Sequence, residues 1–532
     1  MNETNTNTPN PELQRLARAV ALHLKGDAQA ALKELESGEA GGAESGDLLG
    51  ARAHLAFELG RYAEAAETYR RLLVQHPSNS DACYRLGLCL ERLGEHEEAL
   101  GAFQKTLQVD PHRHDASLAE GICLLNLKRH ADAAASFERA LEDGADAERA
   151  LLGKAVALQL SWEYDDAIEL YERLLARNPK SEDALVNLIS LGIQRKAPGD
   201  TRKFADRLLA LQPDSVPALE GLAVAAFSEQ RFDEAAKRYQ RLTELEASNY
   251  DYWFNLGVSY QSQDDFARAL PCYERASKLN PEAVAALVNH ATVLERLGRS
   301  SDARTIYDRV LELAPERDDL RYQRAVLAEQ GEGGTSGGSA EAEQLYREIL
   351  EREPDNVKAR FRWGYLQLQR NNWTGAAESF ERCLQNRTDW PEAQVNLALA
   401  YWKQGKVERA EQTLTTLLAA HPDSRDAIRG LATTALERQD LPKALTFHEK
   451  LIATGEKAPE VLHNTGLLCH QLGQLDKAVG FYREALAAKP DFAEVHLNLG
   501  HTLRALDKQD EAREAWLKAL DLNPELAAGY FL

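Results

Sequence analysis

Six asparagines recur at one position of a repeating pattern, and their side chains could bind polypeptide. Each lies fourteen residues before a position that is usually alanine: Asn187, Asn255, Asn289, Asn396, Asn464 and Asn498. A carboxamide offers two donors and an acceptor, so it can pair with the N–H and C=O groups of an extended peptide whatever side chains that peptide carries. Glycines at the same offset, Gly153, Gly221 and Gly430, interrupt the series. The alternative is that the amides make local contacts or meet water.

Aromatic residues close to the asparagines in sequence are candidate anchors for a bound partner. They are Phe254, Tyr322, Phe361, Tyr365 and Trp402. Rigid aromatic side chains often dominate the energy of a protein interface. Aromatic residues at helical spacing are also common in cores, so we expect some of the five to be buried. The polar atoms of Tyr365 and Trp402 favour a position partly exposed to solvent for those two residues.

No group of residues predicts catalysis or a bound cofactor. The sequence lacks a nucleophile elbow, a Walker loop, a zinc-protease motif and a dinucleotide fingerprint. The glycine-rich run at 331–338 has no lysine before a serine or threonine, so we expect a loop and not a phosphate site. His463, His470 and His501 could converge, but helix axes about 8 to 10 Å apart make shared coordination of a metal awkward. We predict that the protein is not an enzyme and has no catalytic residue, cofactor or metal.

The charge balance restricts the class of partner. Lys and Arg number 63 against 84 Asp and Glu, a formal charge of −21, which repels nucleic-acid phosphates and anionic lipids. We therefore expect a basic or neutral protein or peptide as partner, and no nucleic acid. The sequence has neither an apolar run of about 20 residues nor a signal-peptide pattern, and its six cysteines lack metal-ligand spacing. We expect no membrane insertion, reduced thiols and a cytoplasmic location.

A 34-residue repeat organises the chain. Alanine marks 14 of its 15 expected positions, Thr201 takes the other one, and five residues are inserted before the tenth marker: Ala31, Ala65, Ala99, Ala133, Ala167, Ala235, Ala269, Ala303, Ala342, Ala376, Ala410, Ala444, Ala478 and Ala512. An aromatic residue usually follows four residues later, on the same helical face. Amphipathic segments such as 81–93 and 97–109, joined at Gly94, predict a helical hairpin in each repeat. Because one hairpin cannot bury its apolar faces alone, we expect an all-α solenoid of about fifteen stacked units.

One repeat shows a family resemblance most clearly. It resembles the tetratricopeptide repeat (TPR) through Asn255, Leu256, Gly257, Tyr260, Ala269, Tyr273, Ala276 and Pro281. The resemblance implies a right-handed superhelix whose first helices line a concave groove that binds peptides or partner proteins, and it places the six asparagines and five aromatic residues in that groove. The asparagines are similar to the array in the repeat superhelix of O-linked N-acetylglucosamine transferases. We expect no such catalytic domain here, because no residues remain for one after 526.

The positions of the repeats predict the domain limits. We expect a disordered tail at 1–11, a degenerate N-terminal TPR-like unit at 12–45, a TPR array at 46–317, a TPR with the glycine-rich loop insertion (331–338) at 318–356, a TPR array at 357–526 and an apolar tail at 527–532.

These observations predict a non-catalytic scaffold for protein–protein interaction that binds an extended peptide or partner protein in the concave groove. The alternative is a targeting or regulatory subunit of a separate enzyme or assembly machinery, of the glycosyltransferase, secretion or pilus type. That subunit would dock through the C-terminal end, where Tyr530, Phe531 and Leu532 follow the last repeat without a polar capping helix. The same end offers a surface for self-association, unless these residues fold back onto the last hairpin.

Overall fold

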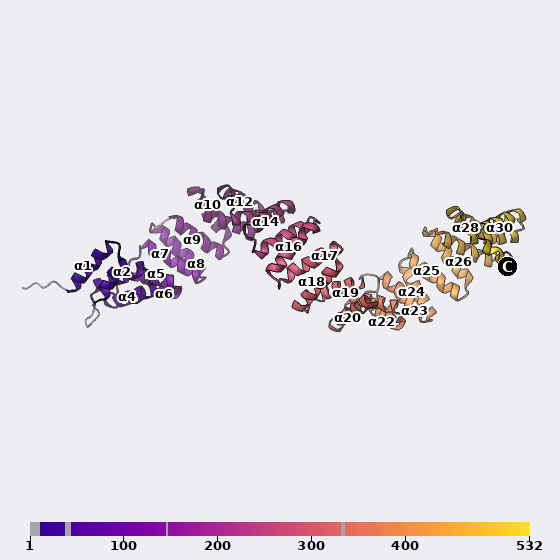
Figure 1. Ribbon diagram of the computed structural model, residues 1–532, viewed down its shortest axis with the longest axis horizontal. Coiled ribbons are helices and arrows are strands. Elements are labelled where there is room, and N and C mark those ends of the chain that lie inside the picture. Colours follow the sequence, from indigo (N-terminus) through magenta and orange to yellow (C-terminus); the bar gives the residue numbers. More distant parts are fainter. Residues whose placement is uncertain (1–10, 38–43, 145–146, 331–335, 532) are drawn as a thin grey trace, which may run out of the picture. The chain divides into compact units, whose positions relative to one another are not determined.

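The computed structural model describes residues 11–37, 44–144, 147–330 and 336–531, which form helices joined by short turns (Figure 1). Within these ranges there is no β-strand. The chain divides into two compact units, Met1–Pro281 and Glu282–Leu532. Both units are built from helical hairpins.

The described helices of the first unit form consecutive hairpins along the chain. They are α1 (Pro11–His23), α2 (Ala28–Glu36), α3 (Gly46–Glu58), α4 (Tyr62–Gln75), α5 (Ser80–Leu93), α6 (His96–Val109), α7 (His114–Asn126), α8 (His130–Glu142), α9 (Ala147–Leu160), α10 (Tyr164–Arg177), α11 (Glu182–Gln194), α12 (Pro198–Leu211), α13 (Val216–Ser228), α14 (Phe232–Leu245), α15 (Tyr250–Gln261) and α16 (Phe266–Leu279).

The second unit continues the same pattern and ends in a short 3₁₀ helix. Its described elements are α17 (Val284–Arg296), α18 (Ser300–Leu313), α19 (Asp318–Glu329), α20 (Ser336–Arg352), α21 (Val357–Gln369), α22 (Trp373–Asn386), α23 (Pro391–Lys403), α24 (Val407–Ala420), α25 (Arg425–Glu437), α26 (Leu441–Ala453), α27 (Pro459–Gln471), α28 (Leu475–Ala488), α29 (Ala493–Ala505), α30 (Gln509–Leu522) and η2 (Pro524–Phe531).

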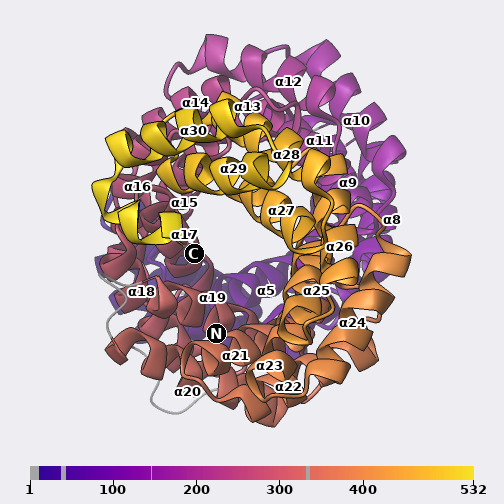
Figure 2. The same cartoon turned by 90° about the vertical axis from the view of Figure 1, so that its right-hand side faces the viewer.

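In the second unit the two helices of each hairpin take different sides of the stack. The first helices α21, α23, α25, α27 and α29 follow the inner side of the ribbon, and the second helices α22, α24 and α26 follow the outer side (Figure 2). Neighbouring first helices touch, as do α21 and α23, α23 and α25, and α27 and α29. Residues at one repeat position of the first helices therefore share one face of this unit.

The marker residues hold the hairpins together. All 14 marker alanines and Thr201 are at most 1% exposed. A small side chain at this position lets helices approach closely, and the aromatic side chain one turn later fills the space beside it: Tyr69, Phe103, Phe137, Tyr171, Tyr239, Tyr273, Tyr307, Tyr346, Phe380, Tyr482 and Trp516 are all buried. The predicted all-α solenoid of stacked hairpins is confirmed.

A glycine on the first helix makes room for the aromatic ring in several hairpins. A Cβ built on Gly257 would lie 2.8 Å from the Cε1 atom of Tyr273. The Phe137 ring lies against two such glycines, Gly121 in its own hairpin and Gly153 in the next. The glycine and the aromatic residue are thus a matched pair in the core.

The turn inside each hairpin has a fixed backbone conformation. Gly94, which the sequence predicted to ease the turn between α5 and α6, has a positive φ of 79°. Trp162 occupies the equivalent place between α9 and α10 with a φ of 69°. This place lies five residues before the marker. Among the described hairpins it has a positive φ in all but α19–α20, whether or not the residue is glycine.

The structure differs from the predicted limits at three places. Residues 336–338 of the loop predicted at 331–338 are helical, since α20 begins at Ser336, and residues 331–335 lie outside the described ranges. Extending an existing helix adds one hydrogen bond for each residue ordered, which favours growth into the glycine run. Pro11, expected in the tail at 1–11, is the first residue of α1, a position that suits proline. The predicted tail at 527–532 is 3₁₀ helix through Phe531, and η2 packs on α29 and α30.

Candidate functional site

The six asparagines all lie on first helices. Asn187 is on α11 and Asn255 on α15 in the first unit, and Asn289, Asn396, Asn464 and Asn498 are on α17, α23, α27 and α29 in the second. Asn464 is exposed and the other five are half-buried. Because all six lie fourteen residues before the marker, each unit presents its asparagines from equivalent turns of its first helices.

Two of the six asparagine side chains make hydrogen bonds within the protein. The Nδ2 atom of Asn187 donates to the backbone oxygen of Asp183 at 2.9 Å, one turn earlier in the same helix. The Nδ2 atom of Asn498 donates to Nε2 of His463 on the neighbouring first helix, also at 2.9 Å. Among the described residues, no hydrogen bond engages the remaining four side chains, those of Asn255, Asn289, Asn396 and Asn464. Their amides are open to another molecule.

Three of the predicted aromatic anchors contact the core of their own hairpin. The ring of Phe254 lies 6.1 Å from that of Tyr273, Tyr322 lies 5.8 Å from Tyr346, and Phe361 lies 5.5 Å from Phe380, all measured between centroids. Each of the three is half-buried. Phe361 also stacks on Trp390, with 4.6 Å between ring centroids, and Phe254 stacks on Tyr250 at 5.8 Å, so these two rings are covered from a second direction as well.

The other two predicted anchors differ in exposure, since Trp402 is half-buried like the first three. Tyr365 on α21 is exposed. The indole Nε1 of Trp402 on α23 donates to Glu437 Oε2 at 2.5 Å, and the Lys403 ammonium lies 4.4 Å from the centre of the indole ring. The polar edge of Trp402 is thus satisfied by a neighbouring helix.

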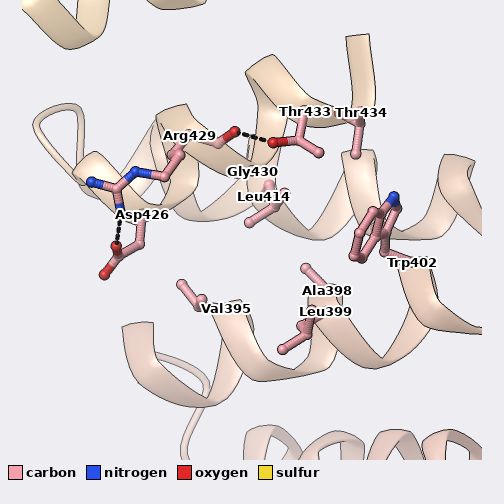
Figure 3. Close-up of a pocket in the computed structure, with 11 residues that line it drawn as sticks. Val395, Ala398, Leu399, Trp402, Leu414, Asp426, Arg429, Gly430, Thr433 and Thr434 are labelled. Atoms are coloured by element: carbon pink, nitrogen blue, oxygen red, sulfur yellow. Dashed lines mark hydrogen bonds and ion pairs between the residues drawn. The ribbon is translucent and has the colours of Figure 1, made fainter. Parts of the chain in front are cut away.

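A cavity beside Trp402 was not predicted from the sequence. It has a volume of about 330 Å³ and lies between α23, α24 and α25 (Figure 3). Its lining residues include Val395, Leu399, Leu414, Gly430 and Thr433. Two departures from the repeat pattern could have indicated its apolar lining, because Leu414 replaces the usual aromatic residue and Gly430 stands where six repeats carry asparagine.

The three histidines do not gather around one point. His463 accepts the hydrogen bond of Asn498, whereas His470 Nδ1 lies 2.8 Å from Thr502 Oγ1 and the ring of His501 packs edge-on against Trp516. Burial lowers the pKa of His463, which agrees with a neutral ring whose Nε2 accepts a hydrogen bond. The described residues contain no group of three or more His, Cys, Asp or Glu side chains that could hold a metal ion.

The cysteines are core residues. All six are free and buried. Burial raises the pKa of the Cys89 thiol to about 11 and that of Cys123 to about 12, so both are protonated at neutral pH and unsuited to nucleophilic attack.

A bilayer-spanning helix is also absent from the part of the chain that the structure describes, where no helix has both the necessary length and the necessary apolar character.

Comparison with known proteins identifies the class to which this solenoid belongs. Family models described as tetratricopeptide repeat match residues 51–114, 94–148, 118–160, 163–216, 220–260, 255–318, 335–391, 367–431 and 493–526, and one described as TPR repeat matches 466–506. The chain belongs to the tetratricopeptide repeat family. No curated protein matches it in sequence.

Several solved structures are similar to parts or most of the chain. A crystal structure of MamA is 21% identical with a TM-score of 0.30, and the match covers 31% of this chain and 96% of MamA. The structure of Naa15/Naa10 bound to HypK-THB is 14% identical with a TM-score of 0.34, covering 97% of this chain and 94% of the other. The APC/C hetero-tetramer Cut9-Hcn1 is 14% identical with a TM-score of 0.32, covering 91% and 94%.

Proposed function

We propose that the protein is a non-catalytic scaffold that binds an extended peptide or a partner protein along its first helices. The observation that carries the proposal is the set of four carboxamides, those of Asn255, Asn289, Asn396 and Asn464, that have no hydrogen bond within the described fold. Each can pair with a backbone N–H and a backbone C=O of a ligand. The exposed Tyr365 and the half-buried aromatic rings would anchor side chains of the same ligand.

The charge of the chain supports a basic or neutral partner. A formal charge of −21 accelerates encounter with a positively charged protein and disfavours nucleic acid. Six free, buried thiols suit a reducing compartment, and we place the protein in the cytoplasm on that ground.

Affinity capture tests this function through the amides of the second unit. The variant combines Asn289→Ala, Asn396→Ala and Asn464→Ala, and the matched control carries Asn386→Ala, an exposed asparagine at the end of the second helix α22. We expect specific partners from the source lysate to be lost from the triple variant and retained by the control, with helicity by circular dichroism the same in both. Retention of the same partners by the triple variant would refute amide-mediated binding.

One observation favours the alternative, a subunit that docks through its C-terminal end. Leu517 on α30, the last α-helix, is 69% exposed and offers an apolar contact at this end. Leu532 lies outside the described residues, as do the side chains of Tyr530 and Phe531. In the same capture, Leu517→Ser distinguishes the two functions: loss of an enzyme or assembly partner with the amide-dependent partners retained supports the subunit.

A further inference from the structure

The cavity beside Trp402 is a hollow on the inner side of the second unit. The first helix α23 contributes Val395, Ala398, Leu399 and Trp402 along one wall, and the next first helix, α25, contributes Gly430 and Thr433 along the other (Figure 3). Leu414 of α24 lies behind them. The hollow therefore opens between two neighbouring first helices, the same helices that carry the asparagine series.

The lining of the hollow departs from the repeat at one position in each of two neighbouring hairpins, at Leu414 on α24 and at Gly430 on α25. The position of Leu414 holds a buried aromatic ring in most hairpins, for example Tyr69 or Phe137. Gly430 stands where other first helices carry the asparagine, and a Cβ added there would come within 2.7 Å of Leu414 Cδ1. The equivalent hollow between α27, α28 and α29 has Tyr482 and Asn498 at these two positions. With leucine and glycine there instead, the hollow beside Trp402 has the more apolar lining of the two.

The walls of the hollow present apolar groups. The hydroxyl of Thr433 donates to the backbone oxygen of Arg429 at 3.0 Å, and that of Thr434 donates to the backbone oxygen of Leu431 at 2.9 Å. Because both hydroxyls already donate a hydrogen bond within their own helix, neither needs a polar group of a ligand as a partner. Leu399 remains exposed at the rim. The chemistry of the hollow suits an apolar side chain.

The surroundings of the hollow are rich in carboxylates. Arg429 is shared between two of them, with Nη1 at 3.2 Å from Asp426 and Nη2 at 2.6 Å from Glu456. Glu437 is a third, at the opposite end beside the indole. Three carboxylates against Arg429 and Lys403 leave net negative charge around an apolar hollow, which complements a cationic residue next to an apolar one.

We propose that this hollow binds the side chain of a phenylalanine in an extended, basic peptide segment of a partner protein. The inference rests on the proposed function and adds a sequence requirement to it. A phenyl ring is an apolar group that can contact Val395, Leu399 and Leu414 together in a hollow of about 330 Å³. The open carboxamide of Asn396 lies one turn before Leu399 on α23 and is placed to hold the peptide backbone beside the anchor.

Two fluorescein-labelled peptides test the anchor by fluorescence polarisation on the full chain. Both are nonapeptides of lysine, serine and glycine, and the central residue is phenylalanine in one and alanine in the other. We expect the phenylalanine peptide to bind at least about tenfold more tightly than the alanine peptide. Equal affinity of the two peptides would overturn the anchor but leave the amide-dependent scaffold standing. Absence of binding by both would also overturn the anchor, while the capture experiment decides on the scaffold.

Filling the hollow provides the decisive variant. Leu414→Phe places in this hairpin the residue type found at Phe103, Phe137 and Phe380. Ala398 is compatible with a ring, because alanine also occupies this position, as Ala53, in the hairpin that buries Tyr69. We expect this variant to lose the tenfold preference for phenylalanine and to bind the alanine peptide as wild type does. The matched control Leu522→Phe, at the end of α30, should keep the preference.

A second variant tests the hollow without changing a buried residue. Leu399→Ser changes only the exposed rim, and we expect it to reduce the preference while circular dichroism and the melting temperature stay unchanged. If both Leu414→Phe and Leu399→Ser keep the full preference for the phenylalanine peptide, the ring binds elsewhere and the proposal is wrong.

Discussion

His448 is an exception among the residues that follow the marker alanines. It lies four residues after Ala444, where most hairpins bury an aromatic ring, and it is only 8% exposed. Its Nδ1 atom lies 3.4 Å from Thr465 Oγ1 on α27. Burial lowers the pKa of His448 below its usual value, because a charged imidazolium loses its hydration there.

The lowered pKa predicts that acid loosens this hairpin. Below the ordinary histidine pKa of about 6.5, the unfolded chain binds a proton that the folded chain resists, so stability falls as the pH falls through that value towards the folded pKa. The slope for one proton is at most about 1.4 kcal/mol per pH unit. We expect amide hydrogen exchange in α26 and α27, corrected for intrinsic rates, to lose protection between pH 7.5 and pH 5.5.

A phenylalanine at this position separates the histidine from other acid effects. His448→Phe keeps a buried ring and removes the titrating group, so its protection in α26 and α27 should depend less on pH than that of wild type. His114→Gln, at an exposed site on α7, is the control and should behave as wild type. An unchanged pH dependence in His448→Phe would show that His448 does not cause the effect.

Residue spacing could predict where the asparagines lie but not which amides are available. The fourteen-residue offset was enough to place all six on first helices. The hydrogen bond of Asn187 to its own helix is one of several local choices open to an asparagine side chain. The partner of Asn498 is His463 in the preceding hairpin, and that pairing depends on how two helices pack. Availability is therefore a property of the packed structure.

At the scale of the element, the turns of the hairpins store backbone strain. Trp162 has a φ of 69° and is 78% exposed, so its side chain gains little from the fold. The left-handed conformation costs a residue with a Cβ about 1 kcal/mol or more relative to glycine. Glycine at equivalent turns, such as Gly94, avoids that cost.

Trp162→Gly is expected to stabilise the α9–α10 hairpin relative to Trp162→Ala. Both variants remove the indole ring and its contact with Tyr164, but only alanine keeps the Cβ that opposes the left-handed turn. The gain is about 0.5 to 1 kcal/mol, since the greater freedom of glycine in the unfolded chain offsets part of the relief. Amide hydrogen exchange in α9 and α10, compared between the two variants, measures this difference in stability. Equal protection in the two variants would mean that the turn is not strained.

The elements themselves were the most predictable part of the fold. The alanine marker and the aromatic residue that usually follows one turn later, together with the amphipathic pattern, define two helices in each repeat. The start of α20 at Ser336 was missed because glycine and serine have weak intrinsic preference for helix, and only the tertiary contacts of the hairpin decide where it begins. The cavity was missed because it depends on Leu414 and Gly430 facing each other across two helices.

At the scale of the whole molecule, stability is a sum of local contacts. In the described part of the chain, the substantial contacts join elements that are one or two places apart in sequence order. A repeat protein of this kind has no single core. A substitution that destabilises one hairpin is therefore expected to lower the stability of that hairpin and of its neighbours only. A buried ion-pair cluster around Arg324 in the second unit offers a test of this property.

Arg324 on α19 joins three helices. Its Nε atom lies 2.7 Å from Asp308 Oδ1 on α18, and its Nη2 atom lies 2.5 Å from Glu341 Oε1 on α20. The arginine side chain is almost fully buried, whereas its two partners are partly exposed and can regain water when it is removed. We therefore expect Arg324→Ala to cost about 2 to 3 kcal/mol, the range for hydrogen bonds to charged groups, and not more.

The loss should remain local. Hydrogen exchange of the full-length Arg324→Ala protein should show reduced protection in α18, α19 and α20 and in the hairpins next to them, with α27 to α30 of the same unit unchanged. Arg309→Ala is the control, since its ion pair with Glu312 is solvent-exposed and contributes less than about 1 kcal/mol. Loss of protection throughout α17 to α30 would instead show that the second unit unfolds as one cooperative body. In that case the helices proposed to bind peptide, around Asn396 and Trp402, could not be altered without affecting the entire unit.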